Sequence, residues 1–144
     1  MSRIVSFRGL IAADGIDTVA LHTINGATGY KIIKMEMLPN NPGTETPESV
    51  VKIYKVPQTT ATAVIDFSDQ TLVAAGIYHG EDTPNYPQDS IVVFDGEIFN
   101  QDVYITHKNT QSATSMNYYI ELEQMPLDLN ENTVATLKDI RNVA

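Results

Sequence analysis

The sequence predicts a mainly β protein: an antiparallel β-sandwich of jelly-roll-like form with a short C-terminal α-helix, built as a single β-rich domain over residues 1–144. Three observations predict this fold. Short alternating or β-branched runs recur between turn signals, which is the pattern of a sandwich or barrel. A chain of 144 residues is long enough to bury a core as one domain. Its hydrophobic content of 42% is typical of a globular protein, and without cysteine the fold must be held by packing.

Eight runs have the composition of strands and are separated by turn-forming residues. They are residues 3–7, 18–23, 30–38, 50–56, 62–67, 90–94, 103–107 and 117–124. Asn25-Gly26 and Thr28-Gly29 favour a hairpin between the second and third runs, because glycine tolerates positive φ. Asp95-Gly96 signals a further turn.

Alternation along a strand indicates which side chains share a face. In the last run, Tyr118, Ile120 and Leu122 form the apolar face, which we assign to the core. The run 30–38 is apolar on both faces, with Ile33, Met35 and Met37 on one and Ile32 and Leu38 on the other. Such a strand is central or covered by a partner, so this run is a candidate subunit contact.

Two segments favour helix. Residues 68–75 open with Ser68 and Asp69, which could cap one or two helical turns, although Leu72-Val73 would suit a strand. Asp128 and Glu131 resemble a capping box and predict the C-terminal helix. Its apolar stripe, which we expect to pack on the sandwich or on a neighbouring subunit, consists of Val134, Leu137 and Ile140.

The net charge is −9, and the nine basic residues are scattered along the chain. Binding a polyanion requires clustered Lys and Arg, so we predict no nucleic-acid partner. No apolar run approaches the roughly eighteen residues of a membrane helix, and the N-terminus has no apolar core of signal-peptide length. We therefore expect a soluble chain without a membrane partner.

The sequence contains no recognisable catalytic motif. His22, His79 and His107 form no metal-type doublet and are interpreted as isolated surface or strand histidines. No Gly-x-Ser-x-Gly turn marks a nucleophile, and no glycine-rich loop would hold a phosphate. We predict a non-enzymatic protein with no catalytic residues and no cofactor.

Two acidic segments are candidate cation sites. Residues 128–132 read Asp-x-Asn-x-Asn, as in a calcium loop, but Thr133 and Asp139 stand where that loop needs Gly and Glu. Glu81, Asp82 and Asp89 bracket a proline-rich loop and could hold a hard cation, although acidic loops also serve solubility. We predict no metal site, and whether this loop binds a cation stays open.

Carbohydrate chemistry is a further alternative. A pair of carboxylates for glycoside hydrolysis is assembled in space, so sequence spacing does not decide against it. Tyr86 and Tyr119 could stack on sugars, but the chain has no tryptophan, the usual stacking platform. We interpret both tyrosines as packing or contact residues.

The second half of the chain contains three segments that are familiar together: residues 65–78 (IDFSDQTLVAAGIY), residues 100–107 (NQDVYITH), and residues 116–125 (MNYYIELEQM) followed by 127–142 (LDLNENTVATLKDIRN). They resemble small virion structural proteins of tailed bacteriophages, particularly those of marine and cyanobacterial hosts. The resemblance implies a capsid decoration or cement protein on the outside of the phage head. Its partners would be the major capsid protein and its own copies, and it would reach the virion after synthesis in the host cytoplasm.

Such a role needs anchor residues on the surface. Aromatic and methionine side chains are enriched at interfaces, so the candidates are Tyr104, Tyr119, Met35 and Met37, with core packing as the competing assignment. A phage tail or adsorption component and a β-sandwich carbohydrate-binding module are the alternative functions.

Overall fold

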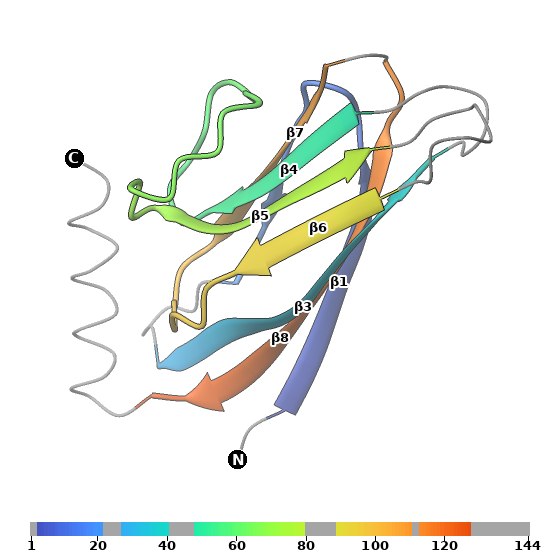
Figure 1. Cartoon of the computed structure of the whole chain (residues 1–144). Helices are drawn as coiled ribbons and strands as arrows, with labels where there is room; N and C mark the ends of the chain where they lie inside the picture. The colour runs from blue at the N-terminus through green and yellow to red at the C-terminus, as the bar shows by residue number, and fades with distance from the viewer. Residues whose placement is uncertain (1–2, 22–26, 41–47, 80–88, 111–112, 128–144) are drawn as a thin grey trace.

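The computed structural model describes residues 3–21, 27–40, 48–79, 89–110 and 113–127, and these residues form two antiparallel sheets that face each other (Figure 1). One sheet has the strand order β1-β8-β3 and the other β2-β7-β4-β5-β6. The mainly β prediction is confirmed, and the two sheets fit a β-sandwich. The strands are β1 (Arg3–Ile11), β2 (Ile16–Val19), β3 (Thr28–Pro39), β4 (Glu48–Tyr54), β5 (Leu72–His79), β6 (Asp89–Phe94), β7 (Val103–Asn109) and β8 (Met116–Pro126).

The inward faces of the two sheets form the core. Tyr118, Ile120 and Leu122 of β8 are 5%, 0% and 0% exposed, which confirms the face predicted from the alternation. They pack in one cluster with residues of the other sheet that include Ile53 and Ile105. The Tyr118 hydroxyl donates a hydrogen bond to the Asp17 carboxylate of β2, so the two sheets are also joined by a polar contact.

A bulge in β3 changes the face assignment made for that strand. The register with β8 shifts between Ile32 and Lys34, so Ile33 has no cross-strand partner. The extra residue places Ile32 on the same inward face as Met35 and Met37, all three buried. Met35 and Met37 are therefore core residues and are not available as surface anchors. Leu38, which the simple alternation grouped with Ile32, is exposed.

The region between β4 and β6 differs from the prediction. Residues 62–67 are not a strand, because their hydrogen bonds are local or come from the Lys52 side chain. The predicted helical turns at 68–75 are also wrong, because β5 begins at Leu72 and runs between β4 and β6. From Leu72 to Tyr78 all residues except Ile77 are buried. A continuous apolar run of this length does not distinguish a buried strand from a buried helix by periodicity alone.

The predicted hairpin between the second and third strands does not form. β2 pairs with β7, whereas β3 pairs with β8 in the other sheet. A glycine-containing connection permits a hairpin, but the partner of each strand is decided by core packing. The C-terminal helix predicted from Asp128, the Asp128–Asn132 segment and the loop with Glu81 and Asp82 lie outside the described residues, as does the side chain of Asp89.

Candidate interaction surfaces

The loop that connects β4 to β5, residues 55–71, is held against the outer face of the five-stranded sheet. Lys52 of β4 points away from the core, because its neighbours Val51 and Ile53 point into it. Its Nζ donates to Thr62 Oγ1 at 2.9 Å and to the Val64 carbonyl at 2.6 Å. The Lys52 side chain is consequently 1% exposed. Figure 1 shows this loop in green, folding back alongside β4.

Two short turns fix the shape of the second half of this loop. Asp66 Oδ1 accepts hydrogen bonds from the Ser68 amide at 3.0 Å and from the Ser68 hydroxyl at 2.6 Å. Asp69 Oδ1 accepts in the same way from the Thr71 amide at 2.9 Å and the Thr71 hydroxyl at 2.6 Å. The bonds from Ser68 lower the pKa of Asp66, so this acceptor is ionised at neutral pH. The loop is therefore ordered by its own side chains as well as by Lys52.

This ordered loop exposes three large apolar side chains. Val64 is 70%, Ile65 37% and Phe67 69% exposed. The outward positions of β5 and β6 on the same side of the sheet are also apolar and exposed, and they are Ile77, Ile91 and Val93. We call these six residues the apolar face.

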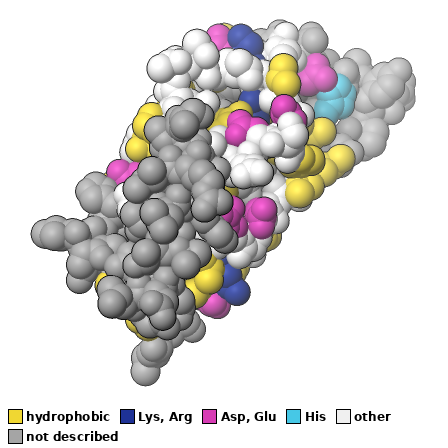
Figure 2. Space-filling model, turned by 90° about the vertical axis from the view of Figure 1, so that its left-hand side faces the viewer, with side chains coloured by type: hydrophobic (Ala, Val, Ile, Leu, Met, Phe, Trp, Pro, Cys, Tyr) yellow, Lys and Arg dark blue, Asp and Glu magenta, His cyan; other side chains and the backbone are white. Residues whose placement is uncertain are grey.

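The two parts of the apolar face lie on the same side of the five-stranded sheet. Lys52 is the cross-strand neighbour of Ala75, and Ala75 is the neighbour of Val93. Since adjacent strands are about 4.8 Å apart, the backbone of Lys52, whose side chain holds the loop, lies about 10 Å from that of Val93. Figure 2 shows a group of hydrophobic side chains on the right of the view, next to a histidine. Sequence reasoning missed the loop part, because its alternation imitates a strand. The signal was the repeated pattern of Asp followed two residues later by Ser or Thr.

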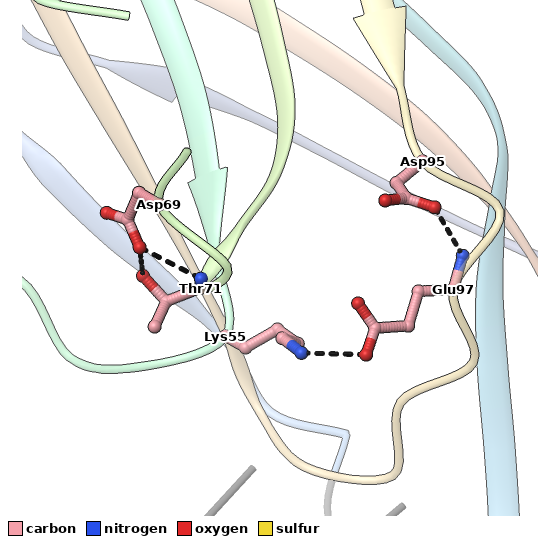
Figure 3. A network of polar contacts seen from close by, with 5 residues as sticks. All are labelled: Lys55, Asp69, Thr71, Asp95 and Glu97. Atoms are coloured by element: carbon pink, nitrogen blue, oxygen red, sulfur yellow. Dashed lines mark hydrogen bonds and ion pairs between the residues drawn. The ribbon is translucent and has the colours of Figure 1, made fainter. Parts of the chain in front are cut away.

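A polar network closes the end of the sandwich near this loop (Figure 3). The buried Lys55 Nζ lies 2.9 Å from Glu97 Oε1, and the Glu97 amide donates to Asp95 Oδ1 at 3.1 Å. The Lys55 amide donates to the Thr71 carbonyl at 2.8 Å. These contacts connect the chain after β6 with both ends of the loop. Asp95 and Gly96 directly follow β6, where the sequence predicted a turn.

Of the two histidines in the described ranges, His107 lies buried inside the sandwich, whereas His79 is exposed. His107 is 0% exposed, and its Nδ1 lies 3.2 Å and 3.1 Å from the carbonyl oxygens of Ile11 and Ala12. Carbonyls only accept, so Nδ1 carries the proton and Nε2 accepts from the Ser49 hydroxyl at 2.9 Å. Burial lowers the pKa of His107. Ser49 is 1% exposed, so this serine–histidine pair is closed to a substrate and fixes the turn after β1.

The outer face of the three-stranded sheet carries a shallow trough of about 620 Å³. Its floor is β8, with Asn117 and Tyr119, and its walls come from β1 and β3. Tyr119 is half-buried, and its hydroxyl donates to Glu121 Oε2 at 2.8 Å, which raises the pKa of Tyr119. The predicted anchor Tyr119 thus lines the trough.

Tyr104, the other predicted anchor, does not line the trough. Tyr104 lies on β7, half-buried on the outer face of the five-stranded sheet beside Thr18 and Tyr54. Burial and the charge of Asp102 raise the pKa of Tyr104. Within the described ranges, no group of three or more His, Asp or Glu side chains is placed to hold a metal ion. The same part of the chain contains no helix that is long and apolar enough to span a membrane.

Comparisons with known proteins identify no family. No protein-family description matches the chain, and no curated protein matches it either. Among solved structures, the Yersinia pseudotuberculosis-derived mitogen is similar with 14% identity and a TM-score of 0.33, with 89% of each chain covered. A structure of Bacillus endospore appendages, described as disulfide-linked pili, is 13% identical with a TM-score of 0.29, covering 89% of this chain and 92% of that chain. Likenesses this weak carry no argument about function.

Proposed function

We propose that this chain is a non-enzymatic capsid decoration or cement protein, which binds the outside of the head of a tailed bacteriophage. The observation that carries the proposal is the ordered loop that displays Val64, Ile65 and Phe67 to solvent. Large apolar side chains on an isolated domain cost solubility unless a partner covers them. A loop already fixed by Lys52 loses little conformational entropy on binding, so it suits a docking element.

The composition of the apolar face agrees with docking on a larger body, because neighbouring exposed apolar side chains mark interaction sites. The six residues of the apolar face occupy one side of the sheet, and none of them is charged. The net charge of −9 keeps unbound copies soluble and apart, so contact with the particle rests on apolar groups.

The strand order supports a jelly-roll form of the sandwich. β6 pairs with β5, and it also approaches β3 of the other sheet. If β6 is assigned to the sheet of β3, the two sheets read β1-β8-β3-β6 and β2-β7-β4-β5. This is the order expected of an eight-stranded jelly roll, in which two Greek keys are folded onto each other.

The proposed partners are the major capsid protein and other copies of this chain, and the proposed location is the capsid surface. The resemblance of the second half of the chain to small phage virion proteins supports this assignment. Residues 65–71 of the loop and β5 as far as Tyr78 fall inside the first resembling segment, residues 65–78. Tyr104 is a candidate for contacts between copies, because it lies on the outer face of the same five-stranded sheet.

The proposal is tested by titrating the purified chain onto undecorated phage heads. Phe67→Ser should weaken binding by roughly thirtyfold, about 2 kcal/mol, because a central apolar anchor is removed. Ile4→Ser is the matched control, since Ile4 is 63% exposed on β1 of the other sheet. It should bind like the unchanged chain. Adding a chelator should have little effect, because no metal site is predicted.

A second experiment, electron microscopy of the virion, discriminates between locations of the chain. Density that repeats over the head lattice in an electron-microscopy map would support decoration, whereas a few copies at one vertex would support a tail or adsorption component. No binding to heads, or equal losses for Phe67→Ser and Ile4→Ser, would overturn the proposal.

A further inference from the structure

We propose that the trough on the outer face of the three-stranded sheet binds a neutral saccharide. The trough has a volume of about 620 Å³, within the range of sites that hold small ligands. The outer faces of the two sheets of a sandwich point in opposite directions. The trough therefore lies away from the apolar face, and the inference does not rest on the proposed role at the capsid.

One end of the trough is apolar. Leu10, Asn117 and Leu38 are direct cross-strand neighbours on β1, β8 and β3. Leu10 is 54% and Leu38 66% exposed, so two leucines rise on either side of a central amide. The carbon–hydrogen face of a sugar ring can lie against such side chains, while a hydroxyl meets the amide between them.

The next row of the trough is polar. Arg8, Tyr119 and Glu36 are cross-strand neighbours, one row further along the same three strands. Among the described residues, neither the Arg8 guanidinium nor the Asn117 side-chain amide has a hydrogen-bond or ion-pair partner. Both groups are planar and present hydrogen-bonding atoms at fixed spacing, which suits adjacent sugar hydroxyls. The Glu36 carboxylate adds an acceptor.

The Tyr119 ring is held in place before any ligand binds. Its hydroxyl donates to Glu121, and Lys34 Nζ lies 5.9 Å from the ring centre. A fixed aromatic side chain loses little rotamer freedom when a ligand packs against it. The ring thus forms a ready apolar floor between Arg8 and Glu36.

The charges of the chain favour a neutral ligand. Arg8 and Glu36, the charged residues in the described lining of the trough, balance each other, so no surplus of positive charge faces it. With a net charge of −9, the chain as a whole repels polyanions. Without tryptophan and in an open trough, the affinity should be weak, with a Kd of about 1 mM.

The test is a titration of the isotopically labelled chain with four neutral trisaccharides: maltotriose, cellotriose, mannotriose and triacetylchitotriose. Amide chemical shifts are followed up to about 10 mM of each sugar, ten times the expected Kd. At least one trisaccharide should give saturable shifts centred on Leu10, Leu38 and the β8 segment that contains Asn117 and Tyr119. Arg8→Ala and Asn117→Ala should each weaken that binding by about tenfold, which is the loss of one hydrogen-bonding group.

Arg3→Ala is the matched control for Arg8→Ala, because Arg3 is an exposed arginine of the same strand outside the trough. It should leave the titration unchanged. The dispersion of the amide spectrum verifies that each variant is folded. Absence of saturable shifts with all four sugars, or shifts that survive both Arg8→Ala and Asn117→Ala, would overturn the proposal. Binding to phage heads is not involved, so either outcome leaves the capsid proposal to its own test.

Discussion

The two outer faces of this sandwich are built differently. On the three-stranded sheet, the outward side chains meet water, and the ion pairs Lys31–Glu123 and Lys34–Glu36 are partly exposed at 3.6 Å and 3.7 Å. On the five-stranded sheet, the outward Lys52 is 1% exposed beneath the loop of residues 55–71. A lysine on a strand is thus a solvent residue on one sheet and a packed residue on the other.

The difference shows how a loop becomes part of the packed structure. A buried ammonium group requires hydrogen bonds, and the Lys52 ammonium obtains them from Thr62 and Val64 in the loop. Its cross-strand neighbour Thr106 is also 1% exposed, and its hydroxyl has no hydrogen-bond partner in the described part of the chain. Opening the loop would expose the Lys52 ammonium to water, so the burial of Lys52 depends on its contacts with Thr62 and Val64.

The largest effect is expected on the inner side of the three-stranded sheet. Leu122→Ala should lower the free energy of unfolding by roughly 2–5 kcal/mol, because the side chain is 0% exposed and its removal leaves a cavity. Glu121→Ala, on the outer side of the same strand, should change it by less than about 0.5 kcal/mol. Urea denaturation measures both. Similar losses would mean that the outer side is packed as well and would end the contrast between the two faces.

Two adjacent tyrosines sharpen the same contrast. Tyr118→Phe should destabilise by about 1.5–3 kcal/mol, because it removes the hydrogen bond to the Asp17 carboxylate between the sheets. Burial is the main reason that the pKa of Tyr118 is raised. Tyr119→Phe removes a bond to Glu121 at the surface and should cost less than about 1 kcal/mol. Thermal unfolding of the two variants compares them directly, and a larger loss for Tyr119→Phe would contradict the assignment of faces.

Replacing Lys52 should have a smaller effect on the free energy of unfolding, but it should make the loop easier to cleave. Lys52→Met keeps the buried aliphatic part of the side chain and removes the ammonium group. The free energy lost with the hydrogen bonds is offset, because the cost of desolvating the ammonium is removed as well. The free energy of unfolding should change by less than about 1 kcal/mol, while limited proteolysis between Thr62 and Ser68 becomes faster. Lys34→Met on the other sheet should alter neither measurement. Unchanged cleavage in Lys52→Met would show that Lys52 does not hold the loop.

The smallest effect is a dependence of stability on pH. Burial holds the pKa of His107 below its usual 6.5 in the folded chain, whereas the unfolded chain binds a proton near that pH. The unfolded state therefore holds more protons, and the free energy of unfolding should fall as the pH decreases from about 7 to about 5. His107→Gln should reduce this slope, and His79→Gln, at an exposed position, should retain it. A slope unaffected by His107→Gln would assign it to other groups.

The sequence was sufficient to predict the core side of a strand where the strand is regular along its length. The alternation of Tyr118, Ile120 and Leu122 predicted the core side of β8, because every second residue of an undisturbed strand points the same way. In β3 the same rule failed at Ile33, since a bulge is stabilised by the pairing with β8 and leaves no local signal.

The candidate surfaces were less accessible to sequence reasoning. Tyr119 was selected by residue type and does line the trough, but its neighbours Arg8 and Glu36 come from strands that pair with β8 only in the folded chain. The apolar loop was interpreted as a strand, because Val64, Ile65 and Phe67 have high strand propensity. What decides against a strand there is the Lys52 side chain, ten or more residues earlier in the sequence.

The position of β8 in the middle of its sheet has a consequence for how the chain folds during synthesis. β1 is made first and pairs only with β8, from Arg3 against Gln124 to Ile11 against Met116. β3 also pairs with β8, so neither strand has its partner until residues 116–126 have left the ribosome. The meander β4-β5-β6, by contrast, can pair as soon as it is made. Folding should therefore start from the five-stranded sheet. The insertion of β8 between β1 and β3, which are synthesised earlier, should be the last and slow step.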